Sequence, residues 1–200
     1  MKLTTWNAYD GLEGVKIARQ YDVLSPQNLN QWMIPYLPEK GNILDIGSGS
    51  GRDAKWYAEL GLDVTCVEPS ASMRDHIKSK FKNNQKVEVL NDYLPNVSKI
   101  KRLKKKFDAI SIMAVWMHVH TYDRLAAMTN LTRMLNDDGV IFLTLRHGPI
   151  PEGRIMYEVS VDEVYKIAKN VGLSVIHSQS DNSDLLNRNT VHWTQIVLKK

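Results

Sequence analysis

The chain has 200 residues, 43% of them hydrophobic, which is enough for one α/β domain with a substantial core. Its net charge of +4 is mild and does not by itself indicate a nucleic-acid-binding protein. The sequence shows neither a signal-peptide pattern nor 18 consecutive apolar residues, so we expect a cytoplasmic protein without membrane contact. Its single cysteine, Cys66, excludes a disulfide within the chain.

The first 40 residues precede the first predicted strand, and we expect them to form a helical cap segment. Ser25 and Pro26 suit the N-cap and first position of a helix that runs to about residue 34. Upstream, Trp6, Tyr9 and Tyr21 are spread through polar sequence. Two interpretations stay open here: a cap that closes over a ligand, or a surface segment held in place by its aromatic residues.

From residue 42 onward, short apolar runs alternate with helical patterns. Strands are predicted at 42–46, 62–67, 86–90, 107–113, 139–146 and 173–179, with helices at 51–60, 70–82, 96–103, 121–136 and 160–171. This alternation predicts one domain over residues 41–200 with a doubly wound parallel sheet covered by helices on both faces. A last strand at 191–198 has no helix before it and is expected to run antiparallel.

A glycine-rich turn follows the first strand, with Gly47, Gly49 and Gly51 at alternate positions. Glycines allow a sharp turn, and the helix that follows offers free N–H groups to an anionic ligand. A P-loop requires Lys and then Ser or Thr, but Arg52 and Asp53 stand there instead. A dinucleotide loop requires its last two glycines three residues apart, whereas these are two apart.

Asp45 and the three glycines complete a D-x-G-x-G-x-G pattern. Here the chain resembles the class I S-adenosylmethionine-dependent methyltransferases, small single-domain enzymes, over roughly residues 40–200. The resemblance implies a Rossmann-like, seven-stranded sheet with a reversed last strand, S-adenosylmethionine as the cofactor, and methyl transfer as the activity. It also implies that the cofactor contacts Asp45, Gly47, Ser48, Gly49, Gly51, Glu68, Pro69, Met73, Asp92, Tyr93, Ala114 and Val115.

Acidic residues follow the second and third strands. Glu68 comes 17 residues after Gly51, where a carboxylate can accept hydrogen bonds from both hydroxyls of a ribose. The alternative is an ordinary solvent-facing acid at a strand end. For the third strand, the resemblance implies that Asp92 accepts a hydrogen bond from an adenine amino group and that Tyr93 lies on the ring. The alternative is a turn-forming Asn-Asp pair.

Candidate catalytic residues follow the fourth and fifth strands. His118 is a candidate general base, with helix-start packing as the alternative. His118 and His120 point to opposite sides of an extended chain, so no metal site is predicted. Arg146 is a candidate to pair an acidic group of the acceptor, or else to bridge a nearby acid. His147 is a second candidate base.

The favoured function is methyl transfer to O, N or S of a small-molecule acceptor. DNA amino groups are not the expected target, because the Asn- or Asp-Pro-Pro-aromatic tetrad of such enzymes is missing. One alternative is an RNA methyltransferase that uses the six basic residues within 99–106, although a solvated helix end is the favoured interpretation of that cluster. Another is an S-adenosylmethionine-binding protein without transferase activity. An NAD-dependent oxidoreductase is the most distant option, and the sequence does not define the oligomeric state.

Overall fold

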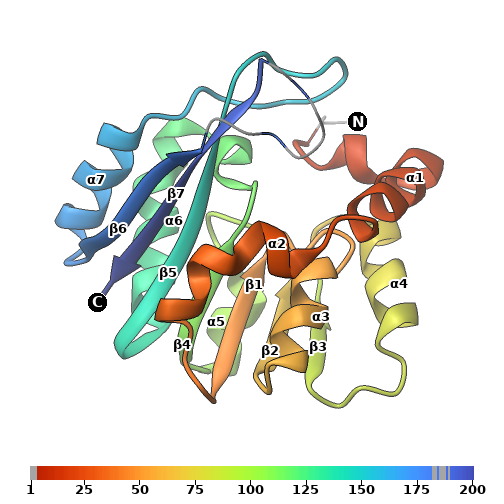
Figure 1. Cartoon of the computed structure of the whole chain (residues 1–200), viewed down its shortest axis with the longest axis horizontal. Coiled ribbons are helices and arrows are strands. Elements are labelled where there is room, and N and C mark those ends of the chain that lie inside the picture. The colour runs from red at the N-terminus through yellow and green to blue at the C-terminus, as the bar shows by residue number, and fades with distance from the viewer. Residues whose placement is uncertain (1–3, 182–183, 185–187, 189) are drawn as a thin grey trace.

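Seven strands in the described part of the chain form one sheet with the order β3-β2-β1-β4-β5-β7-β6 (Figure 1). The computed structural model describes residues 4–181, 184, 188 and 190–200. The strands are β1 (Asn42–Ile46), β2 (Asp63–Val67), β3 (Val87–Leu90), β4 (Phe107–Ile112), β5 (Leu135–His147), β6 (Ser174–Asp181) and β7 (His192–Lys199). β7 is antiparallel to both of its neighbours, while all other pairs are parallel. The predicted Rossmann-like sheet with a reversed last strand is therefore confirmed.

Helices cover both faces of this sheet, as the alternating pattern predicted (Figure 1). One face carries α2 (Pro26–Asn30), the 3-10 helix η2 (Gln31–Tyr36), α3 (Arg52–Glu59) and α4 (Ala71–Lys80). The other carries α5 (Ser98–Leu103), α6 (Arg124–Met134) and α7 (Val161–Asn170). Among the helices of the described residues, none has the length and apolarity needed to cross a bilayer.

The core forms two layers because neighbouring residues of a strand face opposite sides of the sheet. Leu44 and Ile46 of β1 pack with α5, α6 and α7. Ile43 of the same strand packs with residues of η2, α3 and α4. Both faces of the central strands are thus buried, which explains why these strands are continuous apolar runs in the sequence.

The N-terminal segment lies along α4 and reaches the upper edge of the sheet (Figure 1). It contains the 3-10 helix η1 (Asn7–Tyr9) and α1 (Gly11–Asp22). Ser70, the N-cap of α4, accepts a hydrogen bond from the Met73 N–H. Its hydroxyl also lies 2.7 Å from the carbonyl oxygen of Tyr9 and 2.8 Å from the carboxylate of Asp10. These contacts hold the segment in place.

The boundaries of most elements agree with the predictions to within two residues, and two regions differ. Ser25 caps α2 as expected, but the helix predicted to residue 34 becomes the 3-10 helix η2, which contains Pro35. The helix predicted over 121–136 is divided into the 3-10 helix η4 (Thr121–Asp123) and α6, which ends at Met134. β5 begins earlier than predicted because Leu135 pairs with Phe107 of β4.

Gly51 offers a test of how tightly α3 packs against α4. Its φ is +73°, and an added Cβ would lie 3.1 Å from Ile77 and from Phe81. Gly153 has nearly the same φ, +74°, with nothing within 4 Å of an added Cβ. We expect G153A to lose about 1 kcal/mol of unfolding free energy from backbone strain. G51A should lose about 1–3 kcal/mol more from overpacking. Urea unfolding measures both, and equal losses would contradict the tight packing.

Candidate active site

A cavity of about 550 Å³ lies at the carboxyl ends of the parallel strands, within the range typical of ligand sites. Ligands in open α/β sheets bind where the strand order reverses, and here β1 pairs with both β2 and β4. Most of the predicted site residues line the cavity: Gly47, Ser48, Gly49, Glu68, Pro69, Met73, Asp92, Tyr93, Ala114, Val115, His118 and Arg146.

The glycine turn forms one wall of the cavity. The N–H groups of Gly47 and Ser48 both donate to the Val67 carbonyl, which fixes the turn over the end of β2. An added Cβ at Gly47 would lie 2.4 Å from Val115, so only glycine fits there. At Gly49 the nearest atom to such a Cβ is 3.8 Å away, and this position leaves room for a ligand against the backbone.

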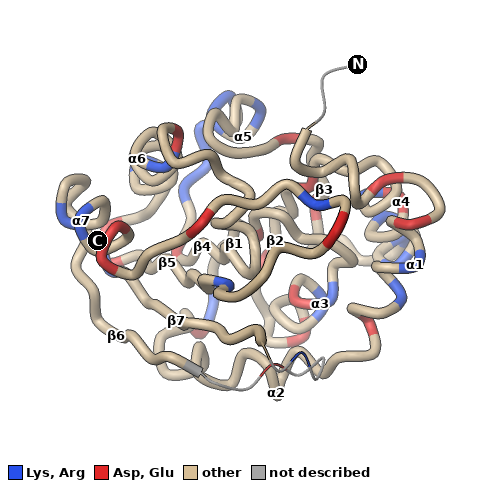
Figure 2. The backbone as a smooth tube through the Cα atoms, turned by 90° about the horizontal axis from the view of Figure 1, so that it is seen from above, with Lys and Arg blue, Asp and Glu red and all other residues tan. Residues whose placement is uncertain are grey.

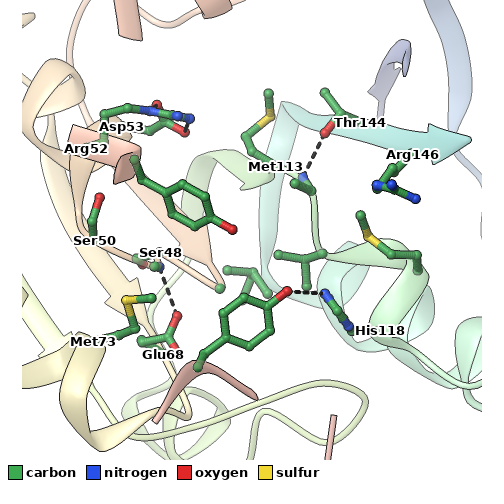
Figure 3. A pocket seen from close by; sticks show the side chains of 18 of the residues that line it. Ser48, Ser50, Arg52, Asp53, Glu68, Met73, Met113, His118, Thr144 and Arg146 are labelled. Carbon is green, nitrogen blue, oxygen red and sulfur yellow. Dashed lines mark hydrogen bonds and ion pairs between the residues drawn. The ribbon is translucent and has the colours of Figure 1, made fainter. Parts of the chain in front are cut away.

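Glu68 connects the turn to the start of α4. Its carboxylate is almost completely buried and accepts hydrogen bonds from the N–H groups of Gly49, at 2.9 Å, and Ser70, at 2.8 Å (Figure 3). Burial raises the pKa of this carboxyl to about 7, although the two N–H groups favour the charged form. A carboxylate oxygen can accept two hydrogen bonds, so each oxygen keeps one position for a ligand hydroxyl.

Ala114 and Val115 form the floor between the two halves of the cavity. Ala114 has a φ of +58°, in a region that residues with a side chain rarely adopt. Its N–H donates to the Thr144 hydroxyl at 2.8 Å (Figure 3), which holds this backbone in place. Trp116 is fully buried in the core, and its neighbour Met117 lines the cavity.

Asp92 lines the cavity but has partners other than the expected adenine. Both of its carboxylate oxygens accept backbone N–H groups at the start of α5, from Tyr93, Ser98, Lys99 and Ile100. These four bonds use the acceptor positions of the carboxylate, so its main task is to cap α5. The ring of Tyr93 is 45% exposed and lies 4.7 Å from that of Trp6, which leaves an aromatic face at this edge.

Asp45 and Gly51 do not line the cavity, and their contact with a ligand stays a prediction. Asp45 is buried beneath the turn, where Ser48 donates to its backbone carbonyl. Burial, together with the nearby charge of Asp53, raises the pKa of the Asp45 carboxyl to about 7. Gly51 lies behind the turn against α4. Both residues support the shape of the turn instead.

His147 also lies outside the cavity lining, so the structure offers no support for its role as a candidate base. Its Nε2 is 3.0 Å from the Thr194 hydroxyl, and its ring stacks on that of His192. The reason is the alternation of side chains along β5: Arg146 points to the cavity, so the next residue points away.

The opposite half of the cavity contains a hydrogen-bonded pair, Tyr9 and His118 (Figure 3). The Tyr9 hydroxyl lies 3.1 Å from Nε2 of His118, and Nδ1 lies 2.9 Å from the Ile155 carbonyl. Because a carbonyl only accepts, Nδ1 carries the ring hydrogen and Nε2 accepts from Tyr9. Burial raises the pKa of Tyr9 to about 12 and lowers that of His118 below its usual value. Both groups are therefore neutral at pH 7.

Several lining residues were not predicted as site residues. Arg154 and Met156 come from the connection between β5 and α7, and Asp184, Arg188 and Trp193 come from the connection between β6 and β7 and from β7 itself. The connections carry no apolar periodicity and no motif that would mark them. Tyr9 was noted as an aromatic residue of the N-terminal segment, but its pairing with a residue 109 positions later has no local signal.

Comparison with known proteins agrees with this geometry. A family model described as a methyltransferase domain matches residues 17–178. The chain is 24% identical over 149 residues to an uncharacterized methyltransferase of Alkaliphilus oremlandii and 27% identical over 139 residues to the putative methyltransferase YqeM of Bacillus subtilis. These matches cover 74% and 70% of this chain, and 66% and 49% of the relatives, so the chain spans about half to two thirds of their length.

Among solved structures, the chain is similar to magnesium protoporphyrin IX methyltransferase of Synechocystis with bound S-adenosylmethionine. The TM-score is 0.69 at 16% identity, over 93% of this chain and 81% of that one. The chain belongs to the methyltransferase domain family, within the class I S-adenosylmethionine-dependent methyltransferases. The open space at Gly49 and the buried Glu68 carboxylate fit S-adenosylmethionine, the methyl donor of this class.

The pKa of Glu68 gives a pH prediction for binding of S-adenosylhomocysteine, the demethylated cofactor. The ionised carboxylate accepts ribose hydroxyls while keeping its two N–H partners, whereas protonation removes acceptor positions. Affinity should therefore rise as the pH rises through about 7. E68Q should bind about 1–3 kcal/mol more weakly at high pH and lose this rise.

Calorimetry between pH 5.5 and 8.5, a range of about 1.5 units either side of that pKa, measures the effect. E88Q, a change on the exposed side of β3, serves as the control and should behave like the unmodified protein. D45N separates the other carboxyl with a pKa of about 7 and should keep the pH dependence. An unchanged slope in E68Q would contradict the ribose assignment.

Proposed function

We propose that this protein transfers a methyl group to O, N or S of a small-molecule acceptor that binds beside Tyr9 and His118. The observation that carries the proposal is the neutral Tyr9–His118 pair, which shares one cavity with the glycine turn and Glu68. A site that only bound the cofactor would have no need of a proton-accepting pair at its far end.

Residues of the turn and of the neighbouring strand ends would hold the cofactor. The backbone at Gly47–Gly49 would lie along it, Glu68 would accept the ribose hydroxyls, and the exposed face of Tyr93 would contact the adenine. Asp92 would keep the adenine edge in shape through its cap on α5. When bound, S-adenosylmethionine supplies an electrophilic methyl group on a sulfonium sulfur that leaves as a neutral thioether.

Tyr9 and His118 would accept the proton that the acceptor loses during methyl transfer. The Tyr9 oxygen can accept a hydrogen bond from an acceptor hydroxyl or ammonium while its own hydrogen points to Nε2 of His118. As the acceptor loses its proton, that proton would pass to Tyr9 and the Tyr9 proton to His118, which becomes an imidazolium stabilised by the Ile155 carbonyl. The lowered pKa of His118 keeps its ring neutral, and ready to accept, down to mildly acidic pH.

The position of the basic cluster, which Figure 2 shows in blue on α5, favours a small molecule over RNA. Lys105 bonds to Thr65, and Lys106 bonds to the Arg133 carbonyl, just before Phe107 begins β4. The cavity lies beyond the other end of this strand, about 20 Å away at 3.3 Å per residue. RNA held by the cluster would be directed away from the cavity. The similar Synechocystis structure is named for a small-molecule substrate, a porphyrin, which also supports this choice.

The acceptor class can be tested with methyl-labelled S-adenosylmethionine and a cell extract separated into metabolites, RNA and protein. We expect label in the low-molecular-weight fraction. Label confined to RNA would overturn the small-molecule acceptor. Binding of S-adenosylmethionine without labelling of any fraction would favour the non-catalytic alternative.

Y9F tests the proton-accepting pair. It removes the hydroxyl but keeps the ring, and should lower the labelling rate by about 10²-fold, the usual contribution of a positioned acid or base. Affinity for S-adenosylhomocysteine should not change. In the unmodified protein, the rate should fall at a lower pH than it would with an ordinary histidine, because burial lowers the pKa of His118.

Y122F is the matched control, since Tyr122 is 90% exposed and does not line the cavity. It should leave both the rate and the pH profile as they are. A Y9F rate equal to that of this control would remove Tyr9 from the chemistry.

A further inference from the structure

Arg146 is an unusual residue in the cavity because it is buried and incompletely paired. Only 7% of the residue is exposed, and its two terminal nitrogens donate to the carbonyls of Gly148 and Pro149, at 3.2 and 2.9 Å. Its Nε has no hydrogen-bond partner among the described residues. A buried N–H of a charged group that lacks a partner is costly, and a ligand with a negatively charged oxygen would satisfy it.

Arg154 is a second cation at the same end of the cavity. Its guanidinium lies 5.0 Å from the centre of the Tyr9 ring. Within the described residues, the ion pairs include none made by Arg146 or Arg154. Aromatic contact orients Arg154 but does not neutralise its charge.

Arg188 and Asp184 are two further charged residues of the cavity lining, and they form a pair with each other. The Asp184 carboxylate is 2.6 Å from Nη2 of Arg188 and also accepts a hydrogen bond from the Trp193 indole. Together, the guanidinium groups of Arg146, Arg154 and Arg188 and the carboxylate of Asp184 carry a net charge of +2. Burial, and then the charges of Arg188 and Arg154, lower the pKa of Arg146, as expected for neighbouring cations that share too few anions.

We infer that the acceptor carries an anionic group, a carboxylate or a phosphate monoester, which binds at Arg146 and Arg154 and places the methyl-accepting atom at the Tyr9 hydroxyl. This inference rests on the proposed function and names its substrate class. Both arginines act electrostatically on Tyr9 and His118, so the anion site and the proposed proton acceptor lie close together. Planar guanidinium groups suit carboxylate and phosphate oxygens through paired hydrogen bonds.

The carboxylate of the cofactor itself is the competing occupant. In Figure 3, Arg146 and His118 lie toward the end of β5, whereas Ser48 and Glu68 lie across the cavity. Arg52, which follows the glycine turn directly, is on that other side, and its charge is neutralised by Asp53 at 2.8 Å. The placement of Arg146 therefore favours the acceptor, and the experiment below separates the two occupants.

The test uses the full chain saturated with S-adenosylhomocysteine and titrated by calorimetry with inorganic phosphate and, separately, with acetate. We expect saturable binding of at least one anion, and the tighter of the two identifies phosphate or carboxylate as the group recognised. R146Q and R154Q should each weaken that binding about tenfold or more, as for loss of a charge-assisted hydrogen bond. R102Q, on the exposed side of α5 and away from the cavity, should not change it.

If R146Q fails to fold, R154Q still tests the inference. Of the two arginines, it is Arg146 that donates to the backbone carbonyls of Gly148 and Pro149, so R154Q leaves these structural hydrogen bonds in place. Anion binding that is absent, or equal in R154Q and the R102Q control, would overturn the inference. An R146Q protein that folds but loses affinity for S-adenosylhomocysteine would assign Arg146 to the cofactor carboxylate and also overturn it.

Failure of the proposed function would look different. If the unmodified protein does not bind S-adenosylhomocysteine, the cofactor assignment fails, and the anion titration is then carried out on the protein alone. A labelled product that passes through an anion exchanger is a neutral compound. Such a product would leave the proposed methyltransferase function intact and overturn only the anionic acceptor.

Discussion

The site depends on one buried carboxylate. Glu68 accepts N–H groups from Gly49 on one side and Ser70 on the other, and so joins the end of β1 to the beginning of α4 across the end of its own strand. A carboxylate in this position costs free energy to bury, which its raised pKa reflects. The cost is offset by two charge-assisted hydrogen bonds and by keeping acceptor positions available at the cavity wall.

The sequence predicted the fold because the fold depends on local patterns, and most of the predicted cofactor residues, which rest on the same patterns, line one cavity. The alternate glycines, the carboxylate one βα unit later and the short continuous apolar strands can each be recognised within a few residues. Asp92 shows the limit of such patterns. Its position after β3 was predicted, but the same carboxylate can serve a ligand or a helix start, and only the fold of residues 98–100 decides between them.

The acceptor half was only partly predictable, since its residues come from segments without periodicity. Arg146 and His118 were found because they follow strands whose ends meet at one edge of the sheet. Tyr9 and Arg154 reach the same place from connections whose course depends on tertiary contacts, and no spacing in the sequence links them. His147 lies outside the cavity for a simpler reason: a one-residue step along β5 reverses the face on which a side chain lies.

Ser70 connects the Glu68 carboxylate to the N-terminal segment. Its N–H donates to the Glu68 carboxylate, and its hydroxyl oxygen accepts the Met73 N–H. The same hydroxyl donates to the backbone carbonyl of Tyr9, whose phenol hydroxyl lies beside His118. Hydrogen bonds through Ser70 therefore connect the two ends of the cavity. On the proposed function, a shift of the Glu68 carboxylate on cofactor binding would reach Tyr9 through these bonds, so we expect the cofactor and the acceptor to bind cooperatively.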